Sequence, residues 1–143
     1  MATIRLEIVS PDSSVYDADI AMLIVRSTGG ELGILPHHAP LVTGLIPHAM
    51  RIKLPDTEEE TLIAVSGGFM EVTPEKITVI ASTAEVPDSI DVNRAKEAYE
   101  RAKERIAAFH QNGDTDKDFD MKRAELALAR AKARLMATRT VFD

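Results

Sequence analysis

The 143-residue sequence predicts a β-rich N-terminal domain followed by a C-terminal antiparallel hairpin of two helices. Short apolar runs, separated by Gly, Pro and Asp at intervals of about 8–12 residues, fill residues 1–86 and are typical of a β-sandwich or barrel. Residues 91–110 contain neither Gly nor Pro and are rich in Ala, Glu, Lys and Arg. A polar break and a second stretch of the same kind follow. We therefore expect two domains, residues 1–86 and residues 87–143.

The predicted strands follow one another along the first domain. Ile4, Leu6 and Ile8 occupy alternate positions, which predicts a half-buried strand that ends at Pro11. A continuous apolar run then predicts a second strand, which is closed by Gly29. The further predicted strands are Glu31–Leu35, Ala49–Leu54, Thr61–Val65, Phe69–Val72 and Ile77–Ile80.

Two helices are predicted after the composition changes at residues 87–89. The first spans residues 91–110, with Asp91 as its N-cap, because an Asp side chain can accept a hydrogen bond from the first turn. Residues 111–118 form the break. The second helix spans residues 120–138, and either Asp118 or Asp120 is its N-cap.

The two helices contain an internal repeat. Residues 94–105 and 123–134 are identical at seven of twelve aligned positions, at an offset of 29. In each copy Arg recurs at spacings of seven and four, so the guanidinium groups fall on one edge of each helix. The two arginine edges are Arg94, Arg101 and Arg105, and Arg123, Arg130 and Arg134.

A stripe of small apolar residues lies beside each arginine edge and predicts the seam between the helices. Alanine buries little area, about 0.5–1 kcal/mol per side chain, so this seam is weakly closed. Two arginine edges that flank it repel each other unless an anion lies between them, and Arg is well suited to phosphate. We expect a hairpin whose closure a polyanion controls. The seam residues are Ala95, Ala98, Ala102, Ile106 and Phe109, and Ala124, Ala127, Leu128, Ala131 and Leu135.

Composition and charge exclude several classes of function. The absence of Cys excludes disulfides and thiolate catalysis, and no apolar run reaches the ~20 residues that cross a bilayer, so membrane association is expected through a partner. The net charge is −6, divided into −8 for residues 1–88 and +2 for residues 89–143. This division indicates two modules with different partners, and the acidic balance and scarce aromatics argue against nucleic-acid binding.

No catalytic or metal-binding constellation is recognisable. The adjacent His37 and His38 lie between two prolines, and no acidic residue or Cys stands at ligand spacing, so we interpret them as part of a surface loop. The Gly pairs at 29–30 and 67–68 match no phosphate-binding loop, and Ser66 lacks a supporting His and acid. We therefore expect a non-catalytic protein without a tightly bound cofactor.

Several longer motifs resemble the epsilon subunit of bacterial F-type ATP synthases. The resemblance rests on residues 25–40, which include GGELGILPHHAP, and on residues 65–72, VSGGFMEV. In the second domain, residues 90–95 (IDVNRA) match the I/L-D-x-x-R-A motif of epsilon subunits that bind ATP. One departure is His37, where many relatives have Gly.

The resemblance implies a flattened ten-stranded β-sandwich and a two-helix domain in the rotor of an enzyme that couples proton translocation to ATP synthesis. The first domain would dock on the gamma subunit and, through one segment, on the membrane c-ring. The protein would be a peripheral protein at the cytoplasmic face of the cell membrane. The docking segment consists of Glu31, Leu32, Gly33, Pro36, His37 and His38.

The same resemblance implies that ATP is a regulatory ligand of the hairpin. Without ATP the helices would extend toward the alpha and beta subunits and inhibit ATP hydrolysis. The alternative is a purely structural rotor adaptor, whose arginines contact protein partners and bind no nucleotide. The implied ATP-binding residues are Glu85, Ile90, Asp91, Arg94, Ala95, Arg101, Arg123, Arg130 and Arg134.

Overall fold

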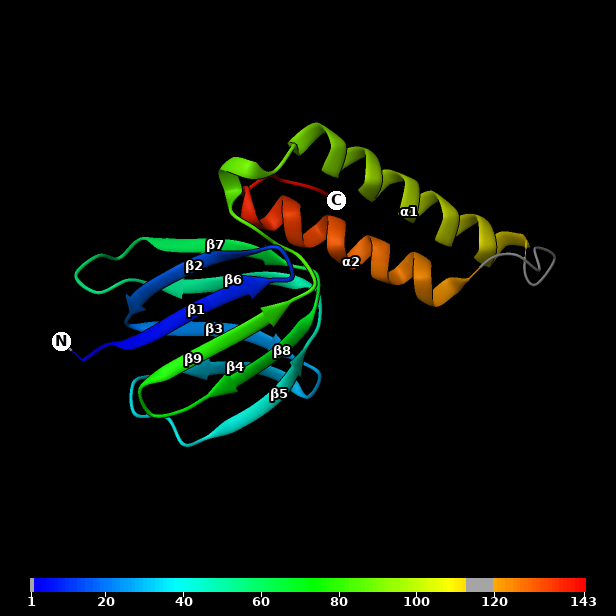
Figure 1. Ribbon diagram of the computed structural model, residues 1–143. Helices are drawn as coiled ribbons and strands as arrows, with labels where there is room; N and C mark the ends of the chain where they lie inside the picture. The colour runs from blue at the N-terminus through cyan, green and yellow to red at the C-terminus, as the bar shows by residue number, and fades with distance from the viewer. Residues whose placement is uncertain (1, 113–119) are drawn as a thin grey trace.

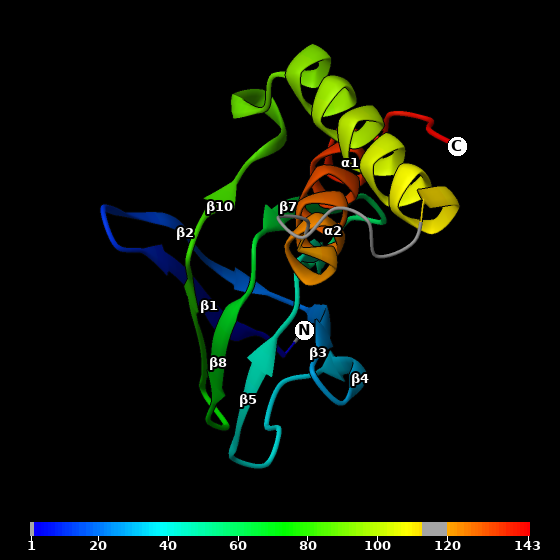
Figure 2. The same cartoon turned by 90° about the vertical axis from the view of Figure 1, so that its right-hand side faces the viewer.

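A β-sandwich head and a pair of antiparallel helices make up the chain, as Figure 1 shows for the computed structural model, which describes residues 2–112 and 120–143. The helices lie side by side at one end of the head. α2 lies between α1 and the head, which Figure 2 shows from the side. The predicted fold class is confirmed.

Ten strands form the head. Their hydrogen-bonded order is β10-β7-β6-β3-β5-β8-β9-β1-β2, and β4 pairs with β3. All pairs are antiparallel except β1 with β9. The strands are β1 Ile4–Ser10, β2 Ser13–Ile20, β3 Met22–Ser27, β4 Gly30–Ile34, β5 Leu41–Leu45, β6 His48–Lys53, β7 Glu60–Val65, β8 Gly68–Val72, β9 Lys76–Ala81 and β10 Ala84–Glu85.

An aliphatic core fills the space between the two layers of the sandwich. Ile4, Leu6 and Ile8 are fully buried in it, so the alternation seen in the sequence is confirmed. Branched side chains on alternate positions of facing strands interdigitate well on a pleated surface. The core therefore needs no Trp and leaves the opposite faces of the strands to solvent or to partners. Its other large members include Ile20, Leu23, Ile34, Met50, Ile52, Ile63, Met70 and Ile77.

Three strands were not predicted from the sequence. β2 is a polar edge strand that pairs only with β1, and its Asp17 and Asp19 both form ion pairs with Arg5 on β1. Because most of its side chains face solvent, apolar periodicity gives little signal there. β10 has only two residues, and β5 places Thr43 and Gly44 between its leucines, so neither shows a clear period of two.

The helices begin close to where the sequence predicted. After a short 3-10 turn, η1 Pro87–Ser89, α1 spans Val92–Asn112 and α2 spans Met121–Ala137. Asp91 accepts a hydrogen bond from the Arg94 backbone N–H, and Asp120 accepts one from that of Arg123, so both are N-caps. The helix α1 continues two residues into the predicted break, and the rest of that break, with Asp118, lies outside the described residues.

The first residue of β6 is a buried histidine. His48 is 7% exposed, its Nδ1 donates to the Ile46 carbonyl at 2.6 Å, and its Nε2 accepts from the Arg26 backbone N–H at 3.0 Å. This arrangement requires the neutral ring, and burial lowers the pKa of His48 from its ordinary value of 6.5. No local pattern in the sequence predicted this role.

Stability is therefore expected to fall in mild acid. The unfolded chain takes up a proton on His48 near pH 6.5, whereas the folded chain does so only at lower pH. The contribution of His48 is complete above pH 6.5 and is lost as the pH falls, with a slope of up to about 1.4 kcal/mol per pH unit. Urea unfolding between pH 7.5 and 5 measures this slope. His48→Asn should remove it and His110→Gln, at an exposed position, should leave it; an unchanged slope in His48→Asn contradicts the assignment.

Candidate functional site

Small residues bring α2 close to the head. Ala133 and Ala137 of α2 pack with Ala64 of β7 and with Ile90, which precedes α1. Ala49 and Leu62 complete this cluster. Because alanine side chains are short, the α2 backbone approaches the sheet closely, and longer side chains one turn away on α2 can reach the head.

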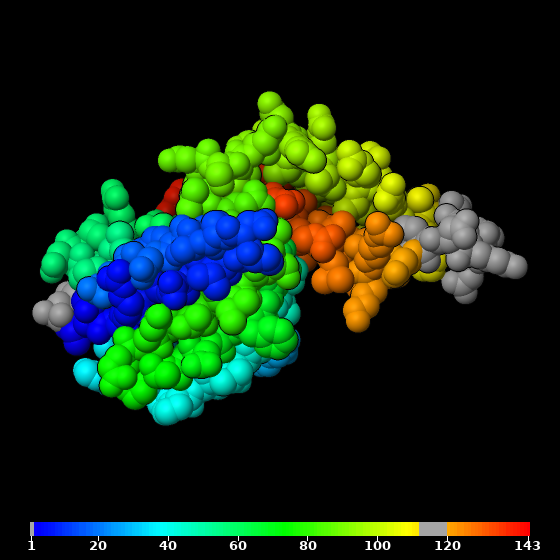
Figure 3. Space-filling model, in the orientation of Figure 1, coloured from blue at the N-terminus to red at the C-terminus, as the bar shows by residue number. Residues whose placement is uncertain are grey.

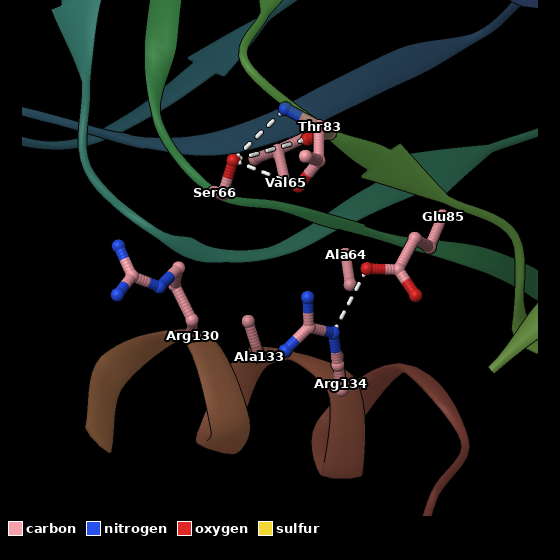
Figure 4. Close-up of a pocket in the computed structure, with 8 residues that line it drawn as sticks. All are labelled: Ala64, Val65, Ser66, Thr83, Glu85, Arg130, Ala133 and Arg134. Carbon is pink, nitrogen blue, oxygen red and sulfur yellow. Dashed lines mark hydrogen bonds and ion pairs between the residues drawn. The ribbon is translucent and has the colours of Figure 1, made fainter. Parts of the chain in front are cut away.

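A shallow recess opens between α2 and the head, as Figure 4 shows. Arg130 and Arg134 extend into it from α2, while Ser66, Thr83 and Glu85 face them from the head. The enclosed space is about 10 Å³, which is room for about one water molecule, so a phosphate group or a nucleotide could meet these arginines only at the open side of the recess. Ala64, Val65 and Ala133 form the rest of its lining.

An ion pair crosses the recess. Arg134 Nε donates to Glu85 Oε1 at 2.8 Å, and their side chains are 32% and 27% exposed. Partial burial shields this pair from solvent more than a surface pair, and it connects α2 directly to β10. Glu85 thus neutralises the charge of Arg134 in the compact arrangement.

Arg130 is the unneutralised cation of the recess. Its side chain is directed toward the head in Figure 4, and no ion pair joins it to another residue of the described ranges 2–112 and 120–143. The nearby hydroxyl groups of Ser66 and Thr83 are hydrogen-bonded to each other at 2.8 Å. Arg130 is therefore the group in the recess that an anion would neutralise.

Residues 90–95, at the start of α1, include both buried and exposed side chains. Ile90 is 8% exposed and Ala95 is 3% exposed, so both side chains are occupied by apolar contacts within the protein. Asp91 and Arg94 are exposed, and Asp91 serves as the N-cap. Together with the exposed Asn93, these two present their side chains to a ligand in solution.

The remaining predicted ATP-binding residues lie outside the recess. Arg101 and Arg123 are exposed on α1 and α2, and neither they nor Arg94 form an ion pair with another described residue. The structure thus brings Glu85, Arg130 and Arg134 together. The two arginine edges were expected to oppose each other at the seam, and this expectation was wrong. Arg130 and Arg134 of α2 face the head instead, where Glu85 neutralises Arg134.

The seam between the helices contains more than alanine. Ala95, Ala131 and Leu135 are buried in it as predicted, but so is Tyr99, whose ring meets that of Phe142. Tyr99 lies four residues after Ala95, so helical spacing alone could have found it. Sequence spacing could not have identified Phe142, Ser66 or Thr83. A reversal of the chain brings Phe142 to the seam, and the packing of α2 on the head places Ser66 and Thr83 at the recess.

The predicted docking segment is part strand and part loop. Glu31, Leu32 and Gly33 belong to β4, and Pro36, His37 and His38 follow it. His37 has a φ of 65°, and its backbone N–H donates to the Pro74 carbonyl. Glycine adopts this left-handed conformation most readily, which gives a physical reason for the Gly that the resemblance implies at this position.

Comparison with known proteins identifies the family. Residues 3–87 match the family model described as "ATP synthase, Delta/Epsilon chain, beta-sandwich domain". Residues 88–139 match "ATP synthase, Delta/Epsilon chain, long alpha-helix domain". The chain belongs to the ATP synthase epsilon family.

Relatives with that name are similar over most of the chain. The ATP synthase epsilon chain of Alkalihalophilus pseudofirmus is 50% identical over 112 residues, which cover 78% of this chain and 83% of the relative. That of Bacillus subtilis is 48% identical over 115 residues, which cover 80% and 84%. Members of the epsilon family are non-catalytic central-stalk subunits of ATP synthase, and the predicted identification is confirmed.

Solved structures share the fold. A chain in the Euglena gracilis mitochondrial ATP synthase, a structure of OSCP, F1 and c-ring, has a TM-score of 0.76 at 22% identity, covering 96% of this chain and 81% of that chain. A chain in the central stalk and c-ring structure of the Tetrahymena thermophila mitochondrial ATP synthase has a TM-score of 0.58 at 14% identity, covering 96% and 97%.

Two further observations concern the described part of this epsilon-family chain. Neither α1 nor α2 has the length and apolar character that would let it cross a bilayer. No group of three or more His, Asp or Glu side chains within residues 2–112 and 120–143 is arranged to hold a metal ion.

The ion pair across the recess should contribute measurably to the docking of the helices. We expect a coupling free energy of about 0.5–1 kcal/mol between Glu85→Gln and Arg134→Gln, because the pair is only partly shielded from solvent. Urea unfolding of the helices, followed by circular dichroism in a double-mutant cycle, measures it. A matched cycle at Arg5 and Asp17, which pair β1 with β2 and touch neither helix, should not affect the helical transition. Strictly additive effects at Glu85 and Arg134 would contradict the assignment.

Proposed function

We propose that the chain is an ATP-responsive regulatory subunit of the ATP synthase rotor. Its compact helical pair binds ATP, and loss of ATP lets the helices extend toward the alpha and beta subunits and inhibit ATP hydrolysis. The observation that carries this proposal is the recess between α2 and the head, in which Arg130, beside the Glu85–Arg134 pair, has no counter-ion among residues 2–112 and 120–143.

Phosphate is the ligand chemistry that such a recess favours. A guanidinium group forms charge-assisted, bidentate hydrogen bonds with phosphate oxygens. Because the recess encloses too little space for a phosphate group, the phosphates would contact Arg130 at its open side, and the remainder of the nucleotide would lie over the exposed start of α1, where Asp91 and Arg94 are accessible. Arg101 and Arg123 are further cations for the phosphate chain.

Linkage turns this binding into a switch. A ligand that binds only the compact arrangement stabilises it by about 1.4 kcal/mol at ten times its dissociation constant. This free energy is comparable with that gained by burying one or two alanine side chains. Alanine side chains make most of the contact between α2 and the head. ATP at about ten times its dissociation constant would therefore shift the equilibrium between the compact and the extended helices toward the compact arrangement.

The head supplies a surface for the rotor partner. Val42, Phe69 and Ile80 are 71%, 65% and 57% exposed on β5, β8 and β9. Phe69 pairs directly with Ile80 and with Gly44, while Val42 lies diagonally from Phe69, so the three side chains share one outer face. Figure 3 shows that the helices leave the side of the head formed by β1, β2, β8 and β9 uncovered.

We assign this apolar face to docking on the gamma subunit, because exposed apolar patches of this kind mark protein interfaces. The segment from Glu31 to His38 is assigned to the membrane c-ring, which would place the subunit at the cytoplasmic face of the membrane as a peripheral component. Glu31 is well exposed there, with Arg26 at 4.0 Å.

ATP binding to the isolated full chain tests the regulatory part of the proposal. We expect Arg130→Ala to weaken ATP binding about tenfold or more in calorimetry, because a charge-assisted hydrogen bond is worth about 1.5–3 kcal/mol. Arg94→Ala and Arg101→Ala should weaken it as well. Lys132→Ala, an exposed charge on α2, is the matched control and should change the affinity less than about twofold. Affinity unchanged in all three Arg variants would favour the structural adaptor, whose arginines contact only protein.

Assembly of the ATP synthase complex tests the docking face. Phe69→Ser should preserve the fold, because the side chain is 65% exposed, but should reduce co-purification of the subunit with gamma by about tenfold or more. Leu126→Ser removes a partly exposed apolar side chain from α2 instead and should leave co-purification unchanged. Equal recovery of wild type and Phe69→Ser would rule out this face as the docking surface.

A further inference from the structure

We propose that residues 138–143, the segment that follows α2, form a clasp that holds both helices in the compact arrangement without any nucleotide. This segment contacts the head, α2 and α1 within six residues. Its regulatory consequence rests on the proposed function, but the clasp itself does not.

A hydrogen-bonded turn reverses the chain after α2. The Thr140 N–H donates to the Leu135 carbonyl at 2.9 Å and the Arg139 N–H to the Met136 carbonyl at 3.0 Å, which is the Schellman pattern at a helix end. Thr138 Oγ1 contacts Thr140 Oγ1 at 2.8 Å. Arg139 has a φ of 57°, a left-handed conformation that a non-Gly residue adopts at a cost in free energy. The turn is thus maintained by specific contacts.

Arg139 attaches the turn to the head. Its Nη2 donates to the backbone carbonyl of Glu60, at the first position of β7, at 2.8 Å. The carboxylate of Glu60 is held in turn by Arg51 through two hydrogen bonds of 2.9 and 2.8 Å. This contact anchors the segment to a strand that is itself ordered by a cross-strand ion pair.

Phe142 attaches the segment to α1. Its ring meets that of Tyr99 edge-on, with centroids 5.1 Å apart and planes at 67°. Tyr99 is 3% exposed, and Lys103 Nζ lies 5.1 Å from the centroid of its ring. Figure 2 shows the segment returning beside α1. The aromatic contact therefore adds to a seam whose other members are mostly small.

Extension that moves the helices off the head and away from each other requires both attachments to break. The Arg139 bond to β7 must be lost, and separation of the helices uncovers Tyr99. The clasp would therefore raise the free energy of the extended form even when ATP is absent, and so lower the ATP concentration that keeps the helices compact. The family match of the helical domain ends at residue 139, so Phe142 lies beyond the matched region.

Amide hydrogen exchange of the nucleotide-free full chain tests the clasp. In Phe142→Ala we expect the α1 amides to exchange about 2- to 10-fold faster than in wild type, because one aromatic pair is lost from the seam. Amides of β1 and β9 serve as the internal reference for an intact head. Val141→Ala is the matched control, since Val141 is 93% exposed, and should leave α1 unchanged. Unchanged α1 exchange in Phe142→Ala overturns the proposal.

A second variant tests whether Phe142 acts through its contact with Tyr99 or through a general destabilisation of the helices. Tyr99→Leu should also speed exchange in α1, and adding Phe142→Ala to it should have little further effect, because the two rings act through one contact. Additive effects of the two substitutions overturn the pairing.

ATP titration of the same exchange distinguishes this proposal from the proposed function. If ATP fails to slow α1 exchange in wild type while Phe142→Ala still speeds it, the clasp stands and ATP sensing fails. If ATP slows α1 exchange in wild type and Phe142→Ala has no effect, ATP sensing stands and the clasp fails.

Discussion

The close packing of α2 on β6 and β7 is the contact on which the rest of the functional arrangement depends. Alanine side chains at this contact let the helix approach the sheet, and only then can Arg134 reach Glu85 and Arg130 face the recess. α1 contacts α2 far more than it does the head, so its position follows from that of α2. Separation of α2 from the head would therefore remove the recess, break the ion pair and release α1 from its position at the same time.

The same packing explains how a small ligand could control a large movement. Alanine contacts bury little area and contribute little free energy each, and the ion pair is partly exposed. A contact of this strength can be shifted by a ligand that contributes one or two kcal/mol, which a core of Leu and Phe would resist. The head, in contrast, has a large aliphatic core, and its ten strands are joined by hydrogen bonds into one sheet. It can therefore remain fixed to its partners while the helices move.

Much of this organisation was predictable from the sequence, for physical reasons. Strict apolar alternation at Ile4, Leu6 and Ile8 and the Gly-free second domain predicted the two kinds of architecture, and Asp91 and Asp120 marked the helix starts. The partner of Arg134 was not predictable, because its pairing with Glu85 depends on how α2 rotates onto the sheet. The role of His48 and the return of Phe142 onto Tyr99 also depend on tertiary contacts with no local period. Periodicity found the arginines, but it could not assign the surface that each one faces.

The population of the compact arrangement as a function of ATP tests the central claim most directly. The chain lacks Cys, so Asp12→Cys on the head and Glu104→Cys on α1, both exposed, accept a donor and an acceptor dye without competing sites. Single-molecule energy transfer on the isolated full chain then reports the distance between head and α1. The account predicts a compact population that grows with ATP and a more distant population that declines. Identical distance distributions at zero and at saturating ATP would contradict it.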